Sequence, residues 1–541
     1  MKTWITSTPP SGVVCKSALL AVSILLCFTL AGCAGTTDVD IDTALGQIRG
    51  YESDGIQRFL GIPYAEPPIG ERRWLPPAQK EPWDGVLLAK EFGPWCAQMD
   101  MDRRDEGDVY SAEGWTIFLN VPPNDESSED CLTLNIIAPV TEEPKPVVVF
   151  FPGNGLGTSF PMYDGTAMAS SDIVFVSVNY RLLSMGIFAH PALTRTAPAD
   201  QSLGRYSEMD RLEALRWVQR NIRVFGGDPD QVTVMGSSEG GAGILQMLGN
   251  PEASGLFHRA IVQSGNGWWE PLSHQEHEQL GCVLATTAGL SGCDATIEEL
   301  RALPWQRLPV TGPYTIDGRQ HTVGATAAIG AGNVIDVPML IGWNDFDGSS
   351  LRYSPQEVIE HTHPDVLRQY DQQKAMEDLA YEIYTDLHAG APARWVAHQL
   401  ENGQPVYLYL YSYVVSWDKG DVRGAEHAYE LPHVLNTWEE TLDDMFPFLS
   451  RFLLKEEDKA MSEIMHECWA SFIRTGQPSC PGAPDWPEYN RVEDQLMELA
   501  LSPRVLTGYR AQQLNAQEAH KEHYFQRVRK SIGEVLREGL Q

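Results

Sequence analysis

Short runs of β-branched and aromatic residues alternate with helical segments along the middle of this 541-residue chain, and this alternation constrains its fold more than any other feature. The runs occupy residues 146–151, 173–179, 231–235, 337–342 and 405–411. They are apolar on both faces, as in parallel strands that helices cover from both sides. The sequence therefore predicts an α/β fold with a large, mostly parallel central sheet and helices on both faces.

Two segments have the pattern of the connecting helices. Apolar residues recur at helical spacing from Ser207 to Val224, and Ser207 together with Asp210 predicts a capping-box start. Residues 355–400 are also mostly helical in pattern, and residues 511–541 predict a charged amphipathic helix. The chain thus offers enough helix to cover the sheet.

The charge of the chain restricts its partners. It carries 73 Asp and Glu against 40 Lys and Arg, a formal net charge of −33. Such an acidic surface repels phosphate backbones, which excludes nucleic acid as a partner. It also excludes electrostatic attachment to anionic membranes. Hydrophobic residues make up 43% of the chain, which is ample for a large buried core.

The N-terminus has the pattern of an export signal. An apolar run from Ser17 to Leu30 is short for a membrane span, and it ends in Leu-Ala-Gly-Cys at residues 30–33. This ending resembles the lipobox of bacterial lipoproteins, which implies that residues 1–32 are removed and that Cys33 carries lipid. The resemblance places the protein in the bacterial cell envelope, facing the periplasm or the exterior. A plain secretory signal or a short anchor is the alternative interpretation.

An exported chain of this kind is expected to contain disulfides. Six cysteines remain beyond Cys33, and their spacing alone leaves the pairing open. The sequence has no C-x-x-C pair and no H-E-x-x-H motif, so we expect neither a metal nor a cofactor. The short histidine groups are expected to be exposed polar residues: His361 with His363, and His274 with His277.

The clearest chemical motif is Gly-Ser-Ser-Glu-Gly at residues 236–240, between the run 231–235 and a small-residue helix at 241–248. A strand–turn–helix of this kind is a nucleophile elbow, in which a tight turn lifts the central serine, Ser238, clear of the sheet. The helix N-terminus places positive partial charge where an oxyanion would form. A glycine-rich turn without chemical role is the alternative.

Further motifs follow in order on both sides of this turn: Phe59–Ala65, Ser128–Asn135, Val178–Leu182, Phe225–Pro229 and Gly255–Gly265. With them, the chain from about residue 40 to 500 resembles the type-B carboxylesterase/lipase family, the cholinesterase-like branch of the α/β-hydrolases. The resemblance implies the α/β-hydrolase fold and hydrolysis of carboxylic esters.

The resemblance also has implications for the cysteines. It implies two disulfides, Cys96–Cys131 and Cys282–Cys293. It implies nothing for the last pair, Cys468 and Cys480, whose state stays open.

The catalytic residues follow from the same comparison, in the chain order serine, acid, histidine. Ser238 is the expected nucleophile, and the segment Gly-Ala-Glu-His that ends at His427 resembles the one bearing the family's base. Asp347 stands where the family usually has Glu, and it suffices because the acid need only orient the imidazole and stabilise its cation. Asp345 is the rival acid, and His433 is expected to be structural.

The chain departs from the family beside the nucleophile. Residues 152–155 read Pro-Gly-Asn-Gly in place of a glycine run, and the backbone N–H groups of Gly153, Asn154 and Glu239 are the expected oxyanion hole. Ser237 and Glu239 replace the family's Glu and Ala on either side of Ser238. A carboxylate beside an oxyanion is unfavourable unless it is protonated or paired. We hypothesise that Glu239 and Asn154 are hydrogen-bonded to each other; separate polar pockets are the alternative.

Together these features predict an exported, lipid-anchored serine hydrolase that cleaves small-molecule carboxylic esters through an acyl-enzyme intermediate. The predicted parts are a signal peptide (1–32), a linker (33–39), an α/β-hydrolase domain (40–510) and a C-terminal helical extension (511–541). A catalytically silent binding or adhesion protein of the same fold is the alternative function, because some family members are adhesion proteins. No oligomeric state is predicted.

Overall fold

The computed structural model describes residues 36–98, 127–153, 157–268, 271–308, 314–319, 322–351, 353–445 and 450–539. The proposed signal peptide, Cys33 and Asn154 lie outside these residues. Thr36–Gln541 forms one compact unit. Strand β1 begins at Thr37, so the last residues of the predicted linker 33–39 are strand instead, because they pair with β2.

The described residues form one 13-stranded sheet with the order β1-β2-β3-β7-β9-β8-β10-β11-β14-β15-β16-β17, and β4 pairs with β2. Neighbouring strands run parallel from β9 to β16 and antiparallel at both flanks. The strands are β1 (Thr37–Thr43), β2 (Gly46–Ser53), β3 (Ile56–Pro63), β4 (Val86–Leu88), β7 (Thr133–Pro139), β8 (Lys145–Phe151), β9 (Val174–Val178), β10 (Gly227–Ser237), β11 (Arg259–Gln263), β14 (Met339–Asn344), β15 (Val406–Tyr411), β16 (Gln495–Leu499) and β17 (Arg504–Thr507).

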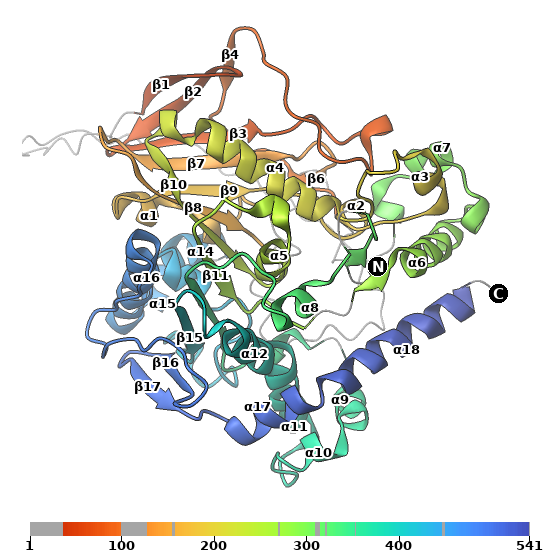
Figure 1. The fold of residues 1–541 in the computed structure, drawn as a ribbon. Coiled ribbons are helices and arrows are strands. Elements are labelled where there is room, and N and C mark those ends of the chain that lie inside the picture. The colour runs from red at the N-terminus through yellow and green to blue at the C-terminus, as the bar shows by residue number, and fades with distance from the viewer. Residues whose placement is uncertain are drawn as a thin grey trace, which may run out of the picture. The chain divides into compact units, whose positions relative to one another are not determined.

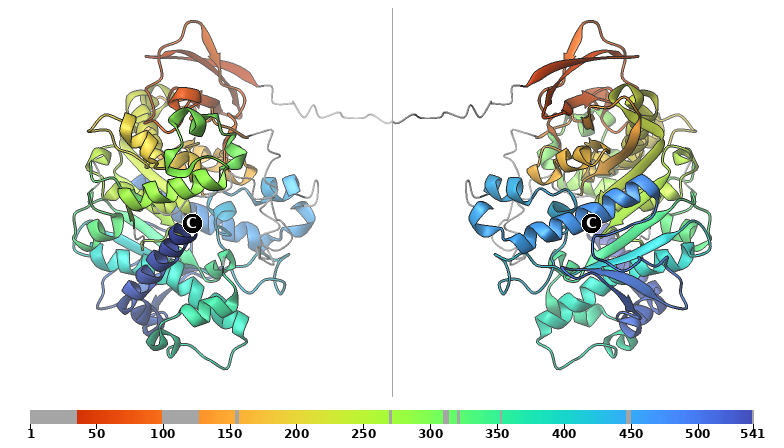
Figure 2. Two further views of the ribbon diagram at one scale, coloured as in Figure 1. Left: turned by 90° about the vertical axis from the view of Figure 1, so that its right-hand side faces the viewer. Right: turned by 90° about the vertical axis from the view of Figure 1, so that its left-hand side faces the viewer.

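Helices cover the sheet from both sides (Figures 1 and 2). The described helices are α1 (Thr166–Ser170), α2 (Leu183–Gly186), α3 (Pro191–Thr196), α4 (Tyr206–Asn221), α5 (Glu239–Leu248), α6 (His274–Thr287), α7 (Ile297–Ala302), α8 (Ala325–Gly330), α9 (Pro355–His361), α10 (Pro364–Leu367), α11 (Met376–Thr385), α12 (Ala391–Leu400), α13 (Leu431–Val434), α14 (Trp438–Met445), α15 (Ser450–Leu453), α16 (Glu456–Thr475), α17 (Ala511–Ala519) and α18 (Lys521–Gly539). None of the described helices is both long and apolar enough to span a bilayer.

The alternation of side chains along β8 divides the core into two layers. Val147 and Val149 pack with α4, α5 and α12 on one face. Val148 and Phe150 pack with α1, α13, α14 and α16 on the other. Leu514 of α17 and Phe525 of α18 join the first layer, so the C-terminal helices bury apolar side chains in the same core. The predicted α/β-hydrolase fold, with a largely parallel central sheet covered on both faces, is confirmed.

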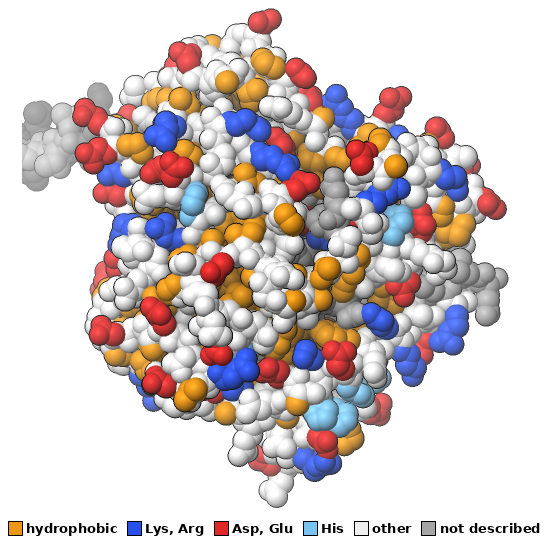
Figure 3. Space-filling view, in the orientation of Figure 1, with side chains coloured by type: hydrophobic (Ala, Val, Ile, Leu, Met, Phe, Trp, Pro, Cys, Tyr) orange, Lys and Arg blue, Asp and Glu red, His pale blue; other side chains and the backbone are white. Residues whose placement is uncertain are grey.

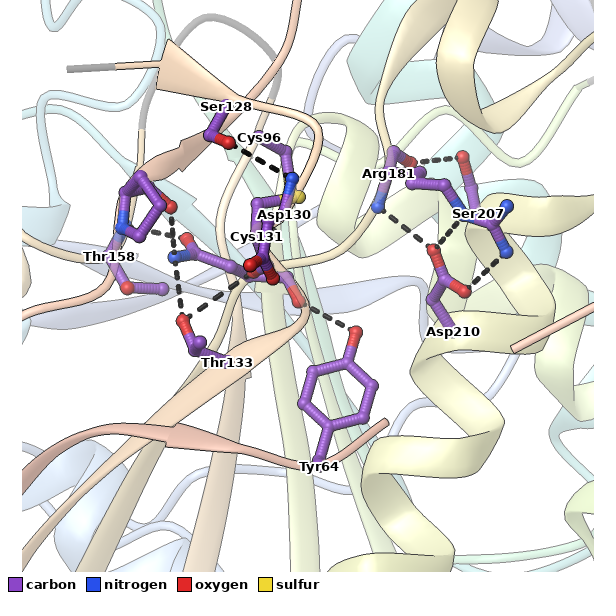
Figure 4. Close-up of a disulfide and its surroundings, with 12 residues drawn as sticks. Tyr64, Cys96, Ser128, Asp130, Cys131, Thr133, Thr158, Arg181, Ser207 and Asp210 are labelled. Carbon is purple, nitrogen blue, oxygen red and sulfur yellow. Dashed lines mark hydrogen bonds and ion pairs between the residues drawn. A yellow bond between two sulfur atoms is a disulfide. The ribbon is translucent and has the colours of Figure 1, made fainter. Parts of the chain in front are cut away.

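The start of α4 differs from the prediction, as Figure 4 shows. The helix begins at Tyr206 after Arg205 without a side-chain cap, so the capping box at Ser207 and Asp210 is wrong. Ser207 donates its hydroxyl to the carbonyl of Arg181 instead. Asp210 accepts two hydrogen bonds of 2.8 Å from the buried Arg181 guanidinium. The Asp210 carboxylate, which the local spacing predicted as part of a helix cap, thus forms a buried ion pair with Arg181 instead.

Three disulfides tie loops to the core: Cys96–Cys131, Cys282–Cys293 and Cys468–Cys480. The first is drawn in Figure 4 beside Tyr64, whose hydroxyl donates to the Asn179 carbonyl at 2.8 Å. The third, whose state the sequence left open, links α16 to the segment after it.

One histidine prediction is wrong. His277 of α6 is fully buried, and its Nδ1 contacts the hydroxyl of Thr315 on a short neighbouring strand, β13 (Thr315–Ile316). Burial lowers the pKa of His277 to about 3. The sequence missed this because the strand that covers His277 comes from a distant segment.

Candidate active site

The turn between β10 and α5 has the geometry of a nucleophile elbow. Ser238 has φ 56° and ψ −119°, a positive-φ conformation outside the left-handed helical region that costs energy for a residue with a side chain. A Cβ on Gly236 would lie 2.5 Å from the carbonyl carbon of Gly240, and one on Gly240 would lie 2.0 Å from the carbonyl oxygen of Phe151. Only glycine fits at either position, as the sequence predicted.

The structure brings the expected base and acid together. His427 Nδ1 lies 2.6 Å from Asp347 Oδ1, and both side chains are nearly buried. The second carboxylate oxygen, Oδ2, accepts the Ser264 hydroxyl at 2.9 Å and the backbone N–H of Asn344 at 2.8 Å. Because Asp347 accepts at Oδ1, the imidazole carries its proton on Nδ1, and Nε2 is its basic nitrogen.

The rival acid Asp345 has another role. Its Oδ1 accepts the backbone N–H of Ala425 at 2.7 Å. Burial raises the pKa of Asp345 to about 7. This carboxyl therefore positions the backbone two residues before His427, while Asp347 contacts the ring.

The loop after β8 lies against the elbow. A Cβ on Gly153 would lie 3.1 Å from Ser238 Cβ and 3.3 Å from the Ser237 carbonyl oxygen, so the two segments are in close contact. The Tyr180 hydroxyl donates to the Pro152 carbonyl at 2.5 Å, which fixes the start of this loop. Gly153 is thus next to the nucleophile, where an oxyanion donor is needed.

Glu239 begins α5, as expected, and it is paired. Arg211 Nη2 of α4 lies 3.2 Å from Glu239 Oε1, and the Arg211 side chain is fully buried. The guanidinium lies over the ring of Tyr180, 4.3 Å from its centroid. Arg211 therefore places a positive charge beside the carboxylate that follows Ser238. The sequence analysis missed this cation because no local pattern marks it.

Glu430 is a second buried carboxyl below the acid and base. It accepts hydrogen bonds from Gln263 Nε2 at 3.0 Å and Asn344 Nδ2 at 2.6 Å. Burial, with the nearby Asp347 charge, raises the pKa of Glu430 to about 7. These bonds tie the carboxyl ends of β11 and β14 together beneath His427. His433 is fully buried, and burial lowers its pKa to about 3, which fits a structural role.

Comparison with known proteins shows the family of this chain. The carboxylesterase family model matches residues 37–362 and 339–517. Carboxylesterase 1C of Rattus norvegicus is 30% identical over 514 residues, 84% of this chain and 89% of that protein. Carboxylesterase 3 of Homo sapiens is 31% identical over 564 residues, 92% of each.

Solved structures show the same fold. A PNB esterase superposes with a TM-score of 0.72 at 26% identity, covering 89% of this chain and 100% of that one. A carboxylesterase of Geobacillus stearothermophilus has a TM-score of 0.73 at 28% identity, covering 88% and 99%. The chain belongs to the carboxylesterase family, and it is a carboxylic ester hydrolase.

Proposed function

We propose that Ser238, His427 and Asp347 are the catalytic triad and that the substrates are small-molecule carboxylic esters. The observation that carries this proposal is the 2.6 Å contact between His427 Nδ1 and Asp347 Oδ1. Ser238 supports it, because its positive-φ elbow conformation is strained and such strain is typical of catalytic sites.

The reaction runs through two acyl transfers. Ser238 Oγ attacks the ester carbonyl carbon as His427 Nε2 takes its proton, and the imidazolium is stabilised by Asp347. The imidazolium then gives this proton to the departing alcohol, which leaves an acyl-enzyme. Water attacks the acyl carbon as Nε2 accepts its proton, and the imidazolium then returns this proton to Ser238 Oγ as the carboxylic acid leaves.

The oxyanion is held by the backbone N–H groups of Gly153, Asn154 and Glu239 in this proposal. The Glu239 charge would oppose the oxyanion, but its partner Arg211 offsets it within the buried layer between α4 and α5. The carboxylesterase relatives do not favour a catalytically silent binding protein, and the pairing answers the objection from Glu239, one of the two departures, with Asn154, that support this alternative. The hypothesis of a Glu239–Asn154 contact stays a prediction.

We also propose that the protein is exported and anchored in the bacterial cell envelope by lipid on Cys33. The lipobox-like residues 30–33 support this, together with an acidic surface that cannot bind anionic lipids by charge. The ester substrates would then be met in the periplasm or outside the cell.

The experiment that tests the triad is labelling with a serine-directed phosphonate, followed by digestion and mass spectrometry. We expect one adduct on the wild-type chain, at Ser238. At the same phosphonate concentration, we expect no adduct on the variants Ser238→Ala and His427→Ala. Ser237→Ala is the matched control, because Ser237 is the adjacent buried serine, and it should label. An adduct on another residue, or none on the wild-type chain, would contradict the proposal.

A further inference from the structure

Four histidines and one aspartate gather on a surface that the proposed reaction does not use. His361 ends α9, His363 caps the start of α10, and Asp365 lies in the first turn of α10. His520 follows α17, and His523 lies in α18. Figure 3 shows pale-blue histidine side chains together near α9 and α17. Two segments far apart in sequence thus bring imidazoles to one place.

Three of these side chains have the spacing of metal ligands. One ligand atom from each of His363, Asp365 and His520 lies within 4.8 Å of the other two, and no other such group occurs in the described parts of the chain. His520 Nε2 lies 3.6 Å from Asp365 Oδ2. The imidazole rings of His363 and His520 stack with their centroids 3.8 Å apart. A tetrahedral ion with ligands at about 2.1 Å keeps neighbouring ligand atoms about 3.4 Å apart. Shifts of about one ångström, together with a turn of one imidazole out of the stack so that both lone pairs point at the ion, would close the site.

The histidines line a small, shallow pocket that opens to solvent. Its other lining residues include Val366, Leu387 and Tyr524, and none of the proposed catalytic residues lines it. His523 Nε2 donates to the His361 carbonyl at 3.2 Å, so Nδ1 is the unprotonated nitrogen of His523. His523 is not among the side chains whose ligand atoms are mutually close, so a water in the open pocket is the expected fourth ligand.

We propose that His363, Asp365 and His520 form a divalent transition-metal site that ties α10 to the junction of α17 and α18. Two imidazole nitrogens and one carboxylate oxygen form a donor set that suits Zn²⁺, whereas Ca²⁺ and Mg²⁺ prefer oxygen ligands alone. Water completes four-coordination. The ion acts as a structural clip that holds the C-terminal helices to the body of the enzyme.

Two contacts and one nearby cation compete with the ion and set its affinity. The Arg368 guanidinium pairs with Asp365, and Arg527 lines the same pocket. The Asp365 backbone N–H donates to His363 Nδ1 at 3.2 Å, so that lone pair is shared unless the ring turns or changes tautomer. We therefore expect moderate affinity, with a Kd of about 1 μM to 10 μM, weaker than dedicated structural zinc sites.

The test is calorimetric titration of the metal-stripped full-length protein with ZnCl₂, and of the variants His520→Gln and Asp365→Asn. We expect one Zn²⁺ per chain. Because loss of an outer-shell partner alone costs about 10- to 100-fold in affinity, each ligand variant should lose at least about tenfold. His274→Gln is the matched control, since His274 is a half-buried surface histidine at another place, and its titration should equal that of the wild type.

Two further readouts keep the result decisive. Co²⁺ bound in place of Zn²⁺ should give the visible absorption of a four-coordinate ion, and Zn²⁺ should raise the Tm of the wild type but not of His363→Gln. Absence of binding, or weak binding that is equal in wild type and ligand variants and therefore belongs to scattered surface acids, would overturn the proposal. Metal-stripped protein is expected to keep its ester hydrolysis. A failure to bind metal would therefore contradict only the metal site, and a failure to label Ser238 would contradict only the catalytic triad.

Discussion

Two aspartates separated by one residue have opposite environments in this site. Asp347 contacts His427 and accepts two further hydrogen bonds through its other oxygen. Asp345 is buried against the backbone of Ala425. Asp347, the acid that the sequence predicts, thus differs from Asp345 in its contacts, although both residues are aspartates.

The first prediction is that Asp347→Asn loses most activity and Asp345→Asn does not. An amide at position 347 favours the wrong imidazole tautomer, so kcat for a short-chain ester should fall on the order of 10³- to 10⁴-fold. The amide oxygen that Asp345→Asn introduces can still accept the Ala425 N–H, so activity should stay within about threefold of wild type. Steady-state kinetics check both. If Asp345→Asn were inactive and Asp347→Asn active, the assignment of the acid would be reversed.

The second prediction concerns stability and pH. Burial raises the pKa of Asp345 from 3.8 to about 7, so the folded state holds a proton that the unfolded chain has released between these values. The free energy of unfolding therefore falls as pH rises through this window, by up to about 1.4 kcal/mol per pH unit from this group. Asp345→Asn removes that loss.

We expect urea unfolding to show Asp345→Asn gaining stability relative to wild type from pH 5 to pH 8. The exposed Asp371→Asn serves as control and should follow the wild-type pH profile. An equal difference between Asp345→Asn and wild type at both pH values would show that the buried carboxyl is already ionised at pH 5.

At the scale of elements, α4 and α5 are joined by a buried ion pair. Removing Glu239 leaves the fully buried Arg211 without this partner, so Glu239→Ala should destabilise the protein by about 3–5 kcal/mol. Glu252→Ala is the matched control, because Glu252 pairs with the half-exposed Arg216, and such pairs contribute about 0–1 kcal/mol. Chemical denaturation measures both.

A double variant separates charge from packing at this position. Arg211→Met with Glu239→Ala replaces the pair by apolar groups and should recover most of the stability lost in Glu239→Ala. If the double variant were less stable than Glu239→Ala, the Arg211 charge would be stabilised by other groups, and the pair would not be the main link between the helices.

Elements were predictable from sequence where local pattern decides them. The central strands β8, β9, β10, β14 and β15 fall on the predicted apolar runs, because strands buried on both faces must be apolar throughout. The elbow was predictable because its glycine pattern is local, although only the Gly236 requirement arises within the turn and that of Gly240 comes from the backbone of Phe151 on β8.

Partners distant in sequence were not predictable. The cap at Ser207 fails because Arg181 competes for Asp210. Arg211 lies 28 positions before its partner Glu239, and no local motif predicts this pair. The histidines of the proposed metal site come from two separate segments, so their spacing in the sequence does not predict the site either. Ordered family motifs supplied the acid and base that periodicity could not.

At the scale of the whole molecule, the net charge of the protein restricts how it can attach to a membrane. The chain has 73 acidic side chains against 40 basic ones, and removal of residues 1–32 takes away two lysines and no acid. With or without the proposed signal peptide, anionic headgroups would repel this net-acidic chain, and screening by salt could only weaken that repulsion. Membrane association of this protein requires a hydrophobic anchor.

The proposed anchor gives the last prediction. With diacyl lipid on Cys33, the wild type should partition into the detergent phase and remain with membranes in high salt, because each buried methylene contributes about 0.8 kcal/mol. Cys33→Ser should lack the acyl mass and either appear in the aqueous phase or retain its uncleaved signal. Cys27→Ser is the matched control, since Cys27 leaves with the signal peptide, and it should behave as wild type. Mass spectrometry of the N-terminal peptide checks this directly: a free amino terminus at any other residue would show that ordinary secretion, without lipid, carries this esterase out of the cytoplasm.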